Sequence, residues 1–404
     1  MVDRSIPAPH HPSSFSDEPE IPAFGQEAMR PPKLSPPQTS GRSRVAANAR
    51  AASNTGKSAK PAHAPRPRRS RDGQRHSGRS YAAIDLGTNN CRLLIAKPAA
   101  DGFVVIDAFS RVVRLGEGLS HSGRLSDEAM DRAVAALAIC ADRLRRRRVY
   151  LARSVATEAC RRASNGAAFI ERVQRETGIL LDIITAEEEA RLAVMGCHIL
   201  LEPGDGPALI FDIGGGSTEL VLVDNRNGTP QILDWVSVPW GVVSLTESET
   251  FDTNCAQARA LAYTNMRERV RSSFGKFAER LPDATQQAKR LLGTSGTVTT
   301  LASVHLDLPC YDRDAIDGLI VPSESMRQIS RDLSLRSPDE RRALPCIGRE
   351  RADLVVAGCA ILESILDIWP AERLGVADRG IREGILRSLM EPGTTERTKG
   401  IASQ

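Results

Sequence analysis

One short segment occurs twice in this chain, and each copy joins an Asp, a glycine-containing turn and a second charged residue. The copy at 84–93 reads Ile-Asp-Leu-Gly-Thr-Asn-Asn-Cys-Arg-Leu, and the copy at 211–220 reads Phe-Asp-Ile-Gly-Gly-Gly-Ser-Thr-Glu-Leu. In both copies apolar residues flank the turn, and the second charged residue follows the Asp by seven positions. This pattern is typical of a β-hairpin with a tip of small polar residues. The duplication predicts a fold built from two related halves.

The two hairpin tips are suited to binding phosphate. Glycine accepts positive φ and lets backbone N–H groups come close to an anion, and small hydroxyls add donors without blocking access. Two such tips facing each other would clamp a phosphate chain. Neither tip is a Walker loop, because no Gly-Lys-Ser/Thr follows at the required spacing. For either copy alone, an ordinary hairpin turn remains the alternative.

Charge and composition separate the first 80 residues from the rest. Residues 1–80 hold 12 of the 24 prolines and 14 Lys and Arg against 6 Asp and Glu, a net of +8 in a chain of net +4. Such a segment buries too little apolar surface to offset its ordering entropy, so we expect a disordered basic tail. Its arginine cluster at 66–71 is the one part of the chain that could contact nucleic acid, although a solvated tail is the simpler interpretation.

Cysteine usage and hydropathy indicate the compartment. The eight cysteines include no Cys-x-x-Cys pair, which argues against a zinc site or a disulfide framework. The start of the chain lacks a continuous apolar segment typical of a signal peptide, and no uncharged apolar run is long enough to span a membrane. We therefore expect a cytoplasmic protein with reduced thiols and no membrane partner.

Strands alternate with helices throughout residues 81–404, and these 324 residues are more than one core usually serves. The pattern predicts an α/β fold of two domains at 81–203 and 204–404, with a final helix near 380–392 that packs back on the first domain. The strands are expected near 81–86, 91–97, 103–109, 148–155, 179–184, 207–213, 218–223 and 231–238. One helix is expected at 126–146 with Ser126 as its N-cap, and a second follows residue 165 and ends near 177. A third begins at Thr185, which forms a capping box with Glu188, and two long helices are expected near 254–280 and 350–368.

Further motifs lie in order between and after the two hairpins: Arg-Leu-Gly-Glu-Gly-Leu at 114–119, Ala-Thr-Glu-Ala-Cys-Arg at 156–161, Glu-Glu-Ala-Arg-Leu at 188–192, Gly-Thr-Ser-Gly-Thr at 293–297 and Arg-Glu-Gly at 382–384. With the hairpins, this series resembles the Ppx/GppA family of exopolyphosphatases and guanosine pentaphosphate phosphohydrolases, in its short two-domain form. The resemblance implies an actin-like ATPase (ASKHA) fold, with two duplicated ribonuclease H-like domains around a phosphate-binding cleft. One departure is Thr-Asn-Asn at 88–90, where the family usually has Ser-Asn-Ser.

The resemblance also assigns roles to acidic residues. It implies that Glu189 orients or deprotonates the attacking water, whereas a helix-dipole acid is the alternative. It implies that Asp212 and Glu219 bind Mg²⁺ or another hard divalent cation, with Glu219 also close to the chemistry. Their alternative roles are a turn cap and an exposed strand residue. Asp85 holds the equivalent place in the first hairpin and is a weaker candidate.

Phosphate is expected to bind to backbone amides, hydroxyls and arginines. A guanidinium can hold two phosphate oxygens at once, and free N–H groups at a helix start suit an anion. For the turn at 293–297, a plain strand-to-helix turn with Ser or Thr as N-cap is nearly as good an interpretation. The expected phosphate-binding residues are Thr88, Asn89, Arg92, Thr157, Arg161, Gly214, Gly215, Gly216, Ser217, Ser295 and Gly296.

The predicted function is metal-dependent release of orthophosphate from the ends of inorganic polyphosphate. Hydrolysis of guanosine pentaphosphate is the first alternative, because the same loops could perform it. A small-molecule kinase on the same fold and a non-catalytic polyanion-binding protein are the remaining alternatives. A homodimer fits the resemblance, although no interface can be identified from one chain.

Overall fold

The computed structural model describes residues 78–100, 102–226, 230–282 and 288–391, all of which lie within the unit formed by residues 67–404. Most of the predicted tail, residues 1–77, lies outside the described residues. The tail prediction extends slightly too far, because Arg79 and Ser80 already contact the fold. The Arg79 guanidinium lies 3.9 Å from the centroid of the Tyr150 ring, and the Ser80 carbonyl accepts a hydrogen bond from the Tyr150 amide.

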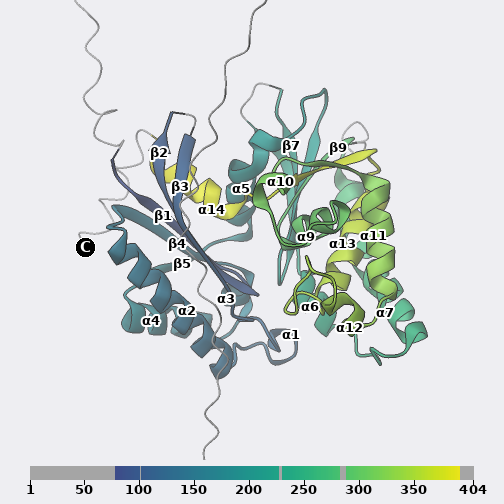
Figure 1. The fold of residues 1–404 in the computed structure, drawn as a ribbon, viewed down its shortest axis with the longest axis horizontal. Coiled ribbons are helices and arrows are strands. Elements are labelled where there is room, and N and C mark those ends of the chain that lie inside the picture. The colour runs from purple at the N-terminus through teal and green to yellow at the C-terminus, as the bar shows by residue number, and fades with distance from the viewer. Residues whose placement is uncertain (1–77, 101, 227–229, 283–287, 392–404) are drawn as a thin grey trace, which may run out of the picture. The chain divides into compact units, whose positions relative to one another are not determined.

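The first sheet has five strands in the order β3-β2-β1-β4-β5 (Figure 1). The hairpin β1–β2 and the pair β2–β3 are antiparallel, whereas β1–β4 and β4–β5 are parallel. The strands are β1 (Tyr81–Leu86), β2 (Asn90–Ala99), β3 (Gly102–Val112), β4 (Leu151–Ala156) and β5 (Leu181–Ile183).

The second sheet repeats this plan and adds one strand. Its order is β10-β11-β9-β6-β7-β8, with the hairpin β6–β7 and the pair β7–β8 antiparallel and the pairs β6–β9 and β9–β11 parallel. Apart from the edge strand β10, each strand matches one of the first sheet in order and direction. The predicted α/β fold and its duplication are confirmed. The strands are β6 (Ala208–Ile213), β7 (Thr218–Asp224), β8 (Gln231–Val238), β9 (Arg290–Thr294), β10 (Ile320–Pro322) and β11 (Arg373–Ala377).

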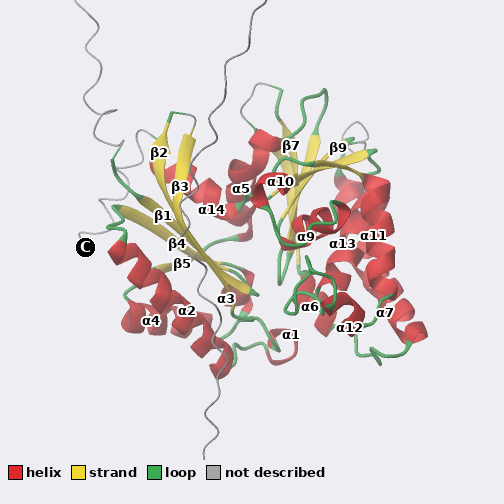
Figure 2. Ribbon diagram, in the orientation of Figure 1, coloured by secondary structure: helices red, strands yellow, loops and turns green. Residues whose placement is uncertain are grey.

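Helices cover the outer face of each sheet (Figure 2). On the first sheet, α2 (Asp127–Arg146) and α4 (Gly166–Thr177) bury a core with the apolar residues of β1 and β2. Helix α2 begins where the sequence predicts, because the Ser126 hydroxyl accepts a hydrogen bond from the Ala129 amide. On the second sheet the covering helices are α7 (Ala256–Arg280), α9 (Gly296–His305), α11 (Ser323–Leu335) and α13 (Val355–Ile368).

The inner faces are covered by two helices that exchange places between the sheets. Helix α5 (Ala186–Cys197) follows the first sheet in the chain but packs on the second, whereas α14 (Ile381–Met390) follows the second sheet and packs on the first. The two helices contact each other closely. A Cβ on Gly384 would lie 2.0 Å from the Leu192 carbonyl oxygen, and a Cβ on Gly196 would lie 2.0 Å from that of Gly380. The boundary at 203/204 stays a prediction.

Three local predictions need correction. The strand expected at 148–155 is β4, three residues shorter at its start, and the helix expected from 350 begins at Val355. Only half of the predicted capping box forms: Thr185 accepts from the Glu188 amide, but the Glu188 carboxylate bonds Arg153 and Arg191 instead. Five short helices complete the described fold, namely α1 (Leu119–Ser122), α3 (Glu158–Arg162), α6 (Val242–Glu247), α10 (Arg313–Ile316) and α12 (Pro338–Arg342), with a 3-10 turn at His198–Leu200.

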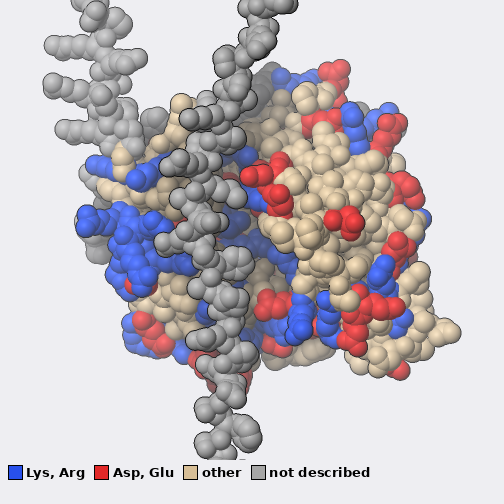
Figure 3. Space-filling model, in the orientation of Figure 1, with Lys and Arg blue, Asp and Glu red and all other residues tan. Residues whose placement is uncertain are grey.

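Positive charge gathers on the first half of the fold. In Figure 3, Lys and Arg are concentrated over the end of α2, at the left, whereas acidic and basic groups alternate over the second half. The last turn of α2 supplies Arg143, Arg145 and Arg146. None of the described helices is long and apolar enough to cross a membrane.

Candidate active site

The two hairpins are built alike down to their hydrogen bonds. In each, the glycine two residues after the Asp donates its amide to the carbonyl three residues further on, at 2.9 Å. Across the first hairpin Asp85 pairs in register with Arg92, and across the second Asp212 pairs with Glu219. The seven-residue offset in the sequence is therefore the distance around one hairpin turn, and it sets two charged groups side by side at the tip of each sheet.

The two tips face each other at close range, as predicted. A Cβ on Gly215 would lie 2.9 Å from the Thr88 Cβ and 3.2 Å from the Asn89 amide, and a Cβ on Gly216 would lie 2.7 Å from the Thr88 hydroxyl. The expected reason for these glycines is wrong, however, because neither has a positive φ. Crowding between the two loops requires them, since any side chain would push the hairpins apart.

One cleft collects almost all of the predicted site residues. Its wall includes both hairpin tips, the start of α5 and the turn before α9. Arg161 is the exception, because it lies behind this wall. The predicted residues that line the cleft are Thr88, Asn89, Arg92, Thr157, Glu189, Asp212, Gly214, Gly215, Gly216, Ser217, Glu219, Ser295 and Gly296.

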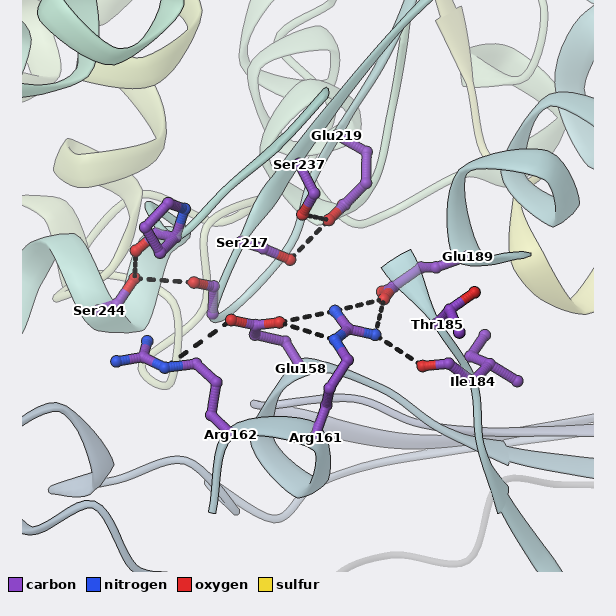
Figure 4. A network of polar contacts seen from close by, with 12 residues as sticks. Glu158, Arg161, Arg162, Ile184, Thr185, Glu189, Ser217, Glu219, Ser237 and Ser244 are labelled. Atoms are coloured by element: carbon purple, nitrogen blue, oxygen red, sulfur yellow. Dashed lines mark hydrogen bonds and ion pairs between the residues drawn. The ribbon is translucent and has the colours of Figure 1, made fainter. Parts of the chain in front are cut away.

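Glu189 lies in the first turn of α5 and is 7% exposed. The Arg161 guanidinium donates to its Oε2 from two nitrogens, each at 3.1 Å (Figure 4). The same guanidinium donates to Glu158 Oε2 at 2.6 and 3.1 Å and to the Ile184 carbonyl at 2.8 Å. The contacts of Arg161 thus fix the Glu189 side chain at the cleft wall and leave its Oε1 atom without a protein partner among the described residues.

Glu219 is fixed by two hydroxyls instead. Its Oε1 accepts from Ser217 and from Ser237, both at 2.7 Å, and the residue is 2% exposed (Figure 4). Burial, followed by repulsion from Asp212, raises the pKa of Glu219 to about 7. Burial also raises the pKa of Asp212 to about 6, although Arg92 opposes the shift. The folded chain thus places too little positive charge near these two carboxylates to offset their burial.

The same deficit extends to two further acids of the cleft, Glu189 and Asp85. Burial and then repulsion by Glu219 raise the pKa of Glu189 well above its usual range. Burial raises the pKa of Asp85, against the opposing effect of Arg92 and Arg382, and its Oδ1 atom is buried without a hydrogen-bond partner. A bound cation would compensate this excess of negative charge.

The donor set fits a divalent cation that is held partly by its substrate. Across the described residues, no group of three or more His, Cys, Asp and Glu is close enough to form a complete metal site. Mg²⁺ does not require one, since it commonly binds one or two carboxylates and completes its shell with phosphate oxygens and water. Asp212 and Glu219, adjacent across one hairpin, are such a pair.

The turn before α9 contradicts one of its two interpretations, the plain N-cap, and phosphate binding there stays a prediction. Ser295 has φ 91° and ψ 176°, a backbone region that costs a non-glycine residue about 1–3 kcal/mol. Its hydroxyl makes no capping hydrogen bond and is buried without a partner. The plain N-cap alternative is therefore wrong, and the free hydroxyl lines the cleft beside the first amides of the helix.

Two arginines line the cleft without an acidic partner among the described residues. Arg92 comes from the first hairpin, and Arg351 from the turn that leads into α13. Arg351 donates to the Thr300 hydroxyl at 2.9 Å, and burial lowers its pKa, with Arg92 lowering it further. Two guanidiniums that repel each other and form no ion pair are suited to binding an anion.

Sequence reasoning missed Arg351 and Glu158 as residues of the cleft. Glu158 lies inside the motif at 156–161 and could have been chosen for its position before Arg161. Arg351 stands in a segment with four charged residues between 349 and 353, where the sequence gives no reason to select one.

Two further motifs support the cleft from behind. The Gly116 amide donates to the Thr88 carbonyl at 2.9 Å, so the motif at 114–119 supports the first loop. The Gly118 amide donates to Glu247 Oε1 at 2.8 Å, which links the two halves. Gly384 permits the close contact of α14 with α5. These motifs are explained by packing.

The duplicated sheets and their paired loops place the chain among the proteins of the actin-like fold. Within that class the chain belongs to the Ppx/GppA phosphatase family, whose sequence model matches residues 94–392. Exopolyphosphatase 2 of Mycobacterium tuberculosis is 31% identical over 322 residues, which cover 76% of this chain and 98% of the relative.

Solved structures agree with this placement. The Aquifex aeolicus member of the Ppx/GppA family is 28% identical with a TM-score of 0.63, over 77% of this chain and 97% of that one. An exopolyphosphatase from Cytophaga hutchinsonii is 26% identical with a TM-score of 0.68, over 77% of this chain and 98% of that one. The predicted family, the actin-like fold and the class of phosphoanhydride hydrolase are thereby confirmed.

Proposed function

We propose that this protein is a cytoplasmic exopolyphosphatase that releases orthophosphate from the ends of inorganic polyphosphate with the help of a divalent cation. The similarity to exopolyphosphatase 2 over almost its whole length supports this substrate. The proposal rests on one observation: a buried glutamate, Glu189, lines the same cleft as Arg92 and Arg351, two arginines that form no ion pair in the part of the chain that the structure describes. A base for water and several sites for phosphate are what hydrolysis of a phosphate chain requires.

Glu189 would accept a proton from the attacking water. The water oxygen then forms a bond to the terminal phosphorus while the bridging P–O bond breaks, and the chain shortened by one phosphate leaves. The raised pKa of Glu189, caused by burial and then by Glu219, makes its carboxylate a stronger base toward water than an exposed glutamate. Arg161 would hold the Glu189 carboxylate in place through the reaction.

The loops would bind the phosphates on either side of the reacting bond. Amides of Gly215 and Gly216 and the Thr88 hydroxyl surround the position between the tips, whereas the Gly214 amide is already engaged by the Ser217 carbonyl. Ser295 and Arg351 lie further along the cleft. A divalent cation held by Asp212 and Glu219 would neutralise phosphate oxygens and the excess negative charge of the cleft.

The test is phosphate release from long-chain polyphosphate by the wild type, Glu189→Gln and Glu187→Gln. Glu187 is the matched control, because it lies in the same helical turn but is exposed. We expect Glu189→Gln to lose about 10²- to 10⁴-fold in kcat while still binding polyphosphate, and Glu187→Gln to stay within about twofold of the wild type. Equal loss in both variants, or none in either, contradicts the assignment of the base.

Substrate preference is decided by competition. Guanosine pentaphosphate is the alternative substrate, and it is offered together with polyphosphate at equal concentration of phosphate ends. We expect polyphosphate to be hydrolysed first. If guanosine pentaphosphate wins, the catalytic assignment survives and the substrate assignment does not.

A further inference from the structure

We propose that a second pocket, between α7, α12 and α13, binds a small aromatic anion and that this ligand adjusts the cleft from behind. The pocket has a volume of about 380 Å³ and shares no wall residue with the cleft. Ligand pockets commonly measure about 300–1,000 Å³ and are apolar with a few convergent polar groups.

The apolar part of the wall suits an aromatic body. It is formed by Phe251, Met266, Val356 and Ala357, together with the ring of Tyr263. The Tyr263 hydroxyl is already engaged, because it donates to Glu363 at 2.6 Å. A flat hydrocarbon group could therefore occupy this part of the pocket without burying an unpaired polar atom.

The polar part of the wall holds two arginines without counter-ions. Arg341 is 5% exposed, and its hydrogen bonds go to the carbonyls of Ala352 and Arg336, both at 2.7 Å. Arg259 donates to two carbonyls at 2.9 Å, while its Nε is buried without a partner. Neither guanidinium forms an ion pair within the described ranges. A buried charge that faces only carbonyls has not recovered its desolvation cost.

The acidic residues of the same wall already have partners. Glu247 accepts from the Gly118 amide at 2.8 Å, and Glu249 is paired with Arg269 at 2.7 Å. Asp353 is paired with Arg342 at 2.9 Å. Two of the three acids of the wall are thus neutralised by arginines, and Glu247, whose hydrogen-bond donors are uncharged, is the one that has no ion pair in the described part of the chain. The two guanidiniums supply the positive charge that the pocket offers to an anion. A sulfonate, phosphate or carboxylate head would match the guanidinium geometry.

A direct path connects this pocket with the cleft. Arg341 holds the carbonyl of Ala352, whereas the next residue back, Arg351, reaches into the cleft and donates to Thr300. An anion that binds the Arg341 guanidinium would change the hydrogen bond from this guanidinium to the Ala352 carbonyl, and with it the position of the turn that carries Arg351. Two sites that bias one structural element are energetically coupled. The ligand is therefore expected to change the affinity of the cleft for phosphate.

The probe for binding is 8-anilinonaphthalene-1-sulfonate, an aromatic anion whose fluorescence rises in an apolar site. Its neutral counterpart, N-phenyl-1-naphthylamine, has the same ring system without the sulfonate. Two variants change the pocket: Arg259→Gln removes the charge and keeps a polar side chain, and Val356→Phe fills the apolar end. Arg336→Gln is the control, since this neighbouring side chain is exposed and only its backbone takes part.

We expect one saturable site per chain for the sulfonate, and at least tenfold weaker binding of the neutral probe. Arg259→Gln should weaken sulfonate binding at least tenfold, Val356→Phe should abolish it, and Arg336→Gln should leave it unchanged. Sulfonate binding of equal strength in all three variants, or equal binding of both probes, overturns the site. If Val356→Phe fails to fold, Arg259→Gln still decides the question.

The coupling is tested separately, and only this part depends on the proposed function. Saturating sulfonate is expected to change KM for polyphosphate at least threefold in the wild type and to have no effect in Val356→Phe. Binding without any change in KM supports the site and refutes the coupling. If polyphosphate is not a substrate at all, the binding experiment is unaffected.

Discussion

Replacing Gly384 by Ala tests whether the contact between α14 and α5 positions the catalytic base. The added Cβ would lie 2.0 Å from the backbone oxygen of Leu192, where real Cβ contacts are essentially never below 3.0 Å. The helices must therefore separate by at least 1.0 Å at this point. Leu192 lies three residues after Glu189 on α5, so the displacement occurs about one turn from the proposed base.

Two effects of known size follow from that displacement. Overpacking of a tight contact costs about 1–3 kcal/mol, whereas the higher helix propensity of Ala returns up to about 1 kcal/mol. The expected net loss is about 1–2 kcal/mol in the free energy of unfolding. A shift of about 1 Å in a reacting group can cost about 10²-fold in rate. We expect a loss of about 10- to 100-fold in kcat, with KM changed much less.

The assays are denaturant unfolding and steady-state phosphate release. Gly275→Ala is the matched control, because Gly275 lies inside α7 and nothing surrounds its Cβ position within 4 Å. This variant should gain about 0.5–1 kcal/mol in stability and keep its activity. If Gly384→Ala is as stable and as active as the wild type, the close crossing of the helices is refuted. If it loses stability alone, α14 supports the fold without positioning Glu189.

Three further predictions concern the cleft. Because burial raises the pKa of Glu189, ionising it costs folding free energy as pH rises from its ordinary value through the raised one. Glu189→Gln should therefore be more stable than the wild type at pH 8 and lose that advantage toward pH 4. In the pH profile of the wild-type rate, the fall on the acid side should occur above the ordinary pH range of carboxylate titration. Equal unfolding curves of the two proteins at both pH values contradict this. Ser295→Gly should gain about 1–3 kcal/mol in unfolding experiments by relieving its backbone, yet raise KM through the lost hydroxyl; a loss of stability counts against strain. Arg351→Gln should raise KM for polyphosphate about tenfold or more with a smaller effect on kcat, whereas Arg336→Gln should change neither, and a fall in kcat alone would contradict a role in binding.

The residues of the site that could be predicted are those that lie within a short sequence motif. The Asp-to-charge spacing predicts both hairpins, because seven positions are the length of one turn with its paired residues. Glu189 and Glu219 could be selected because each stands within a motif that places it at the end of an element. Nothing comparable marks Arg351, whose position in the cleft depends on packing between α9 and α13.

The glycines show why a correct choice of residue can rest on the wrong cause. From sequence, Gly215 and Gly216 suggest unusual backbone angles, since that is the commonest local reason for glycine. The real reason is the approach of Thr88, more than a hundred residues away in the chain. The same holds for Gly384, which the sequence marks within a motif but whose contact with α5 only the folded chain reveals.

The exchange of α5 and α14 between the sheets explains how two copies of one unit make a single catalytic centre. If each sheet covered its own inner face, a base and a phosphate loop from one copy would lie on that copy alone. Because α5 leaves the first sheet to pack on the second, Glu189 arrives beside the second hairpin, where it feels the charge of Glu219. The copies have also diverged at one register position, Arg92 in the first and Glu219 in the second. In the proposed reaction one hairpin would offer a cation to the phosphate chain and the other a pair of carboxylates to a metal, so that neither copy would be sufficient without the other.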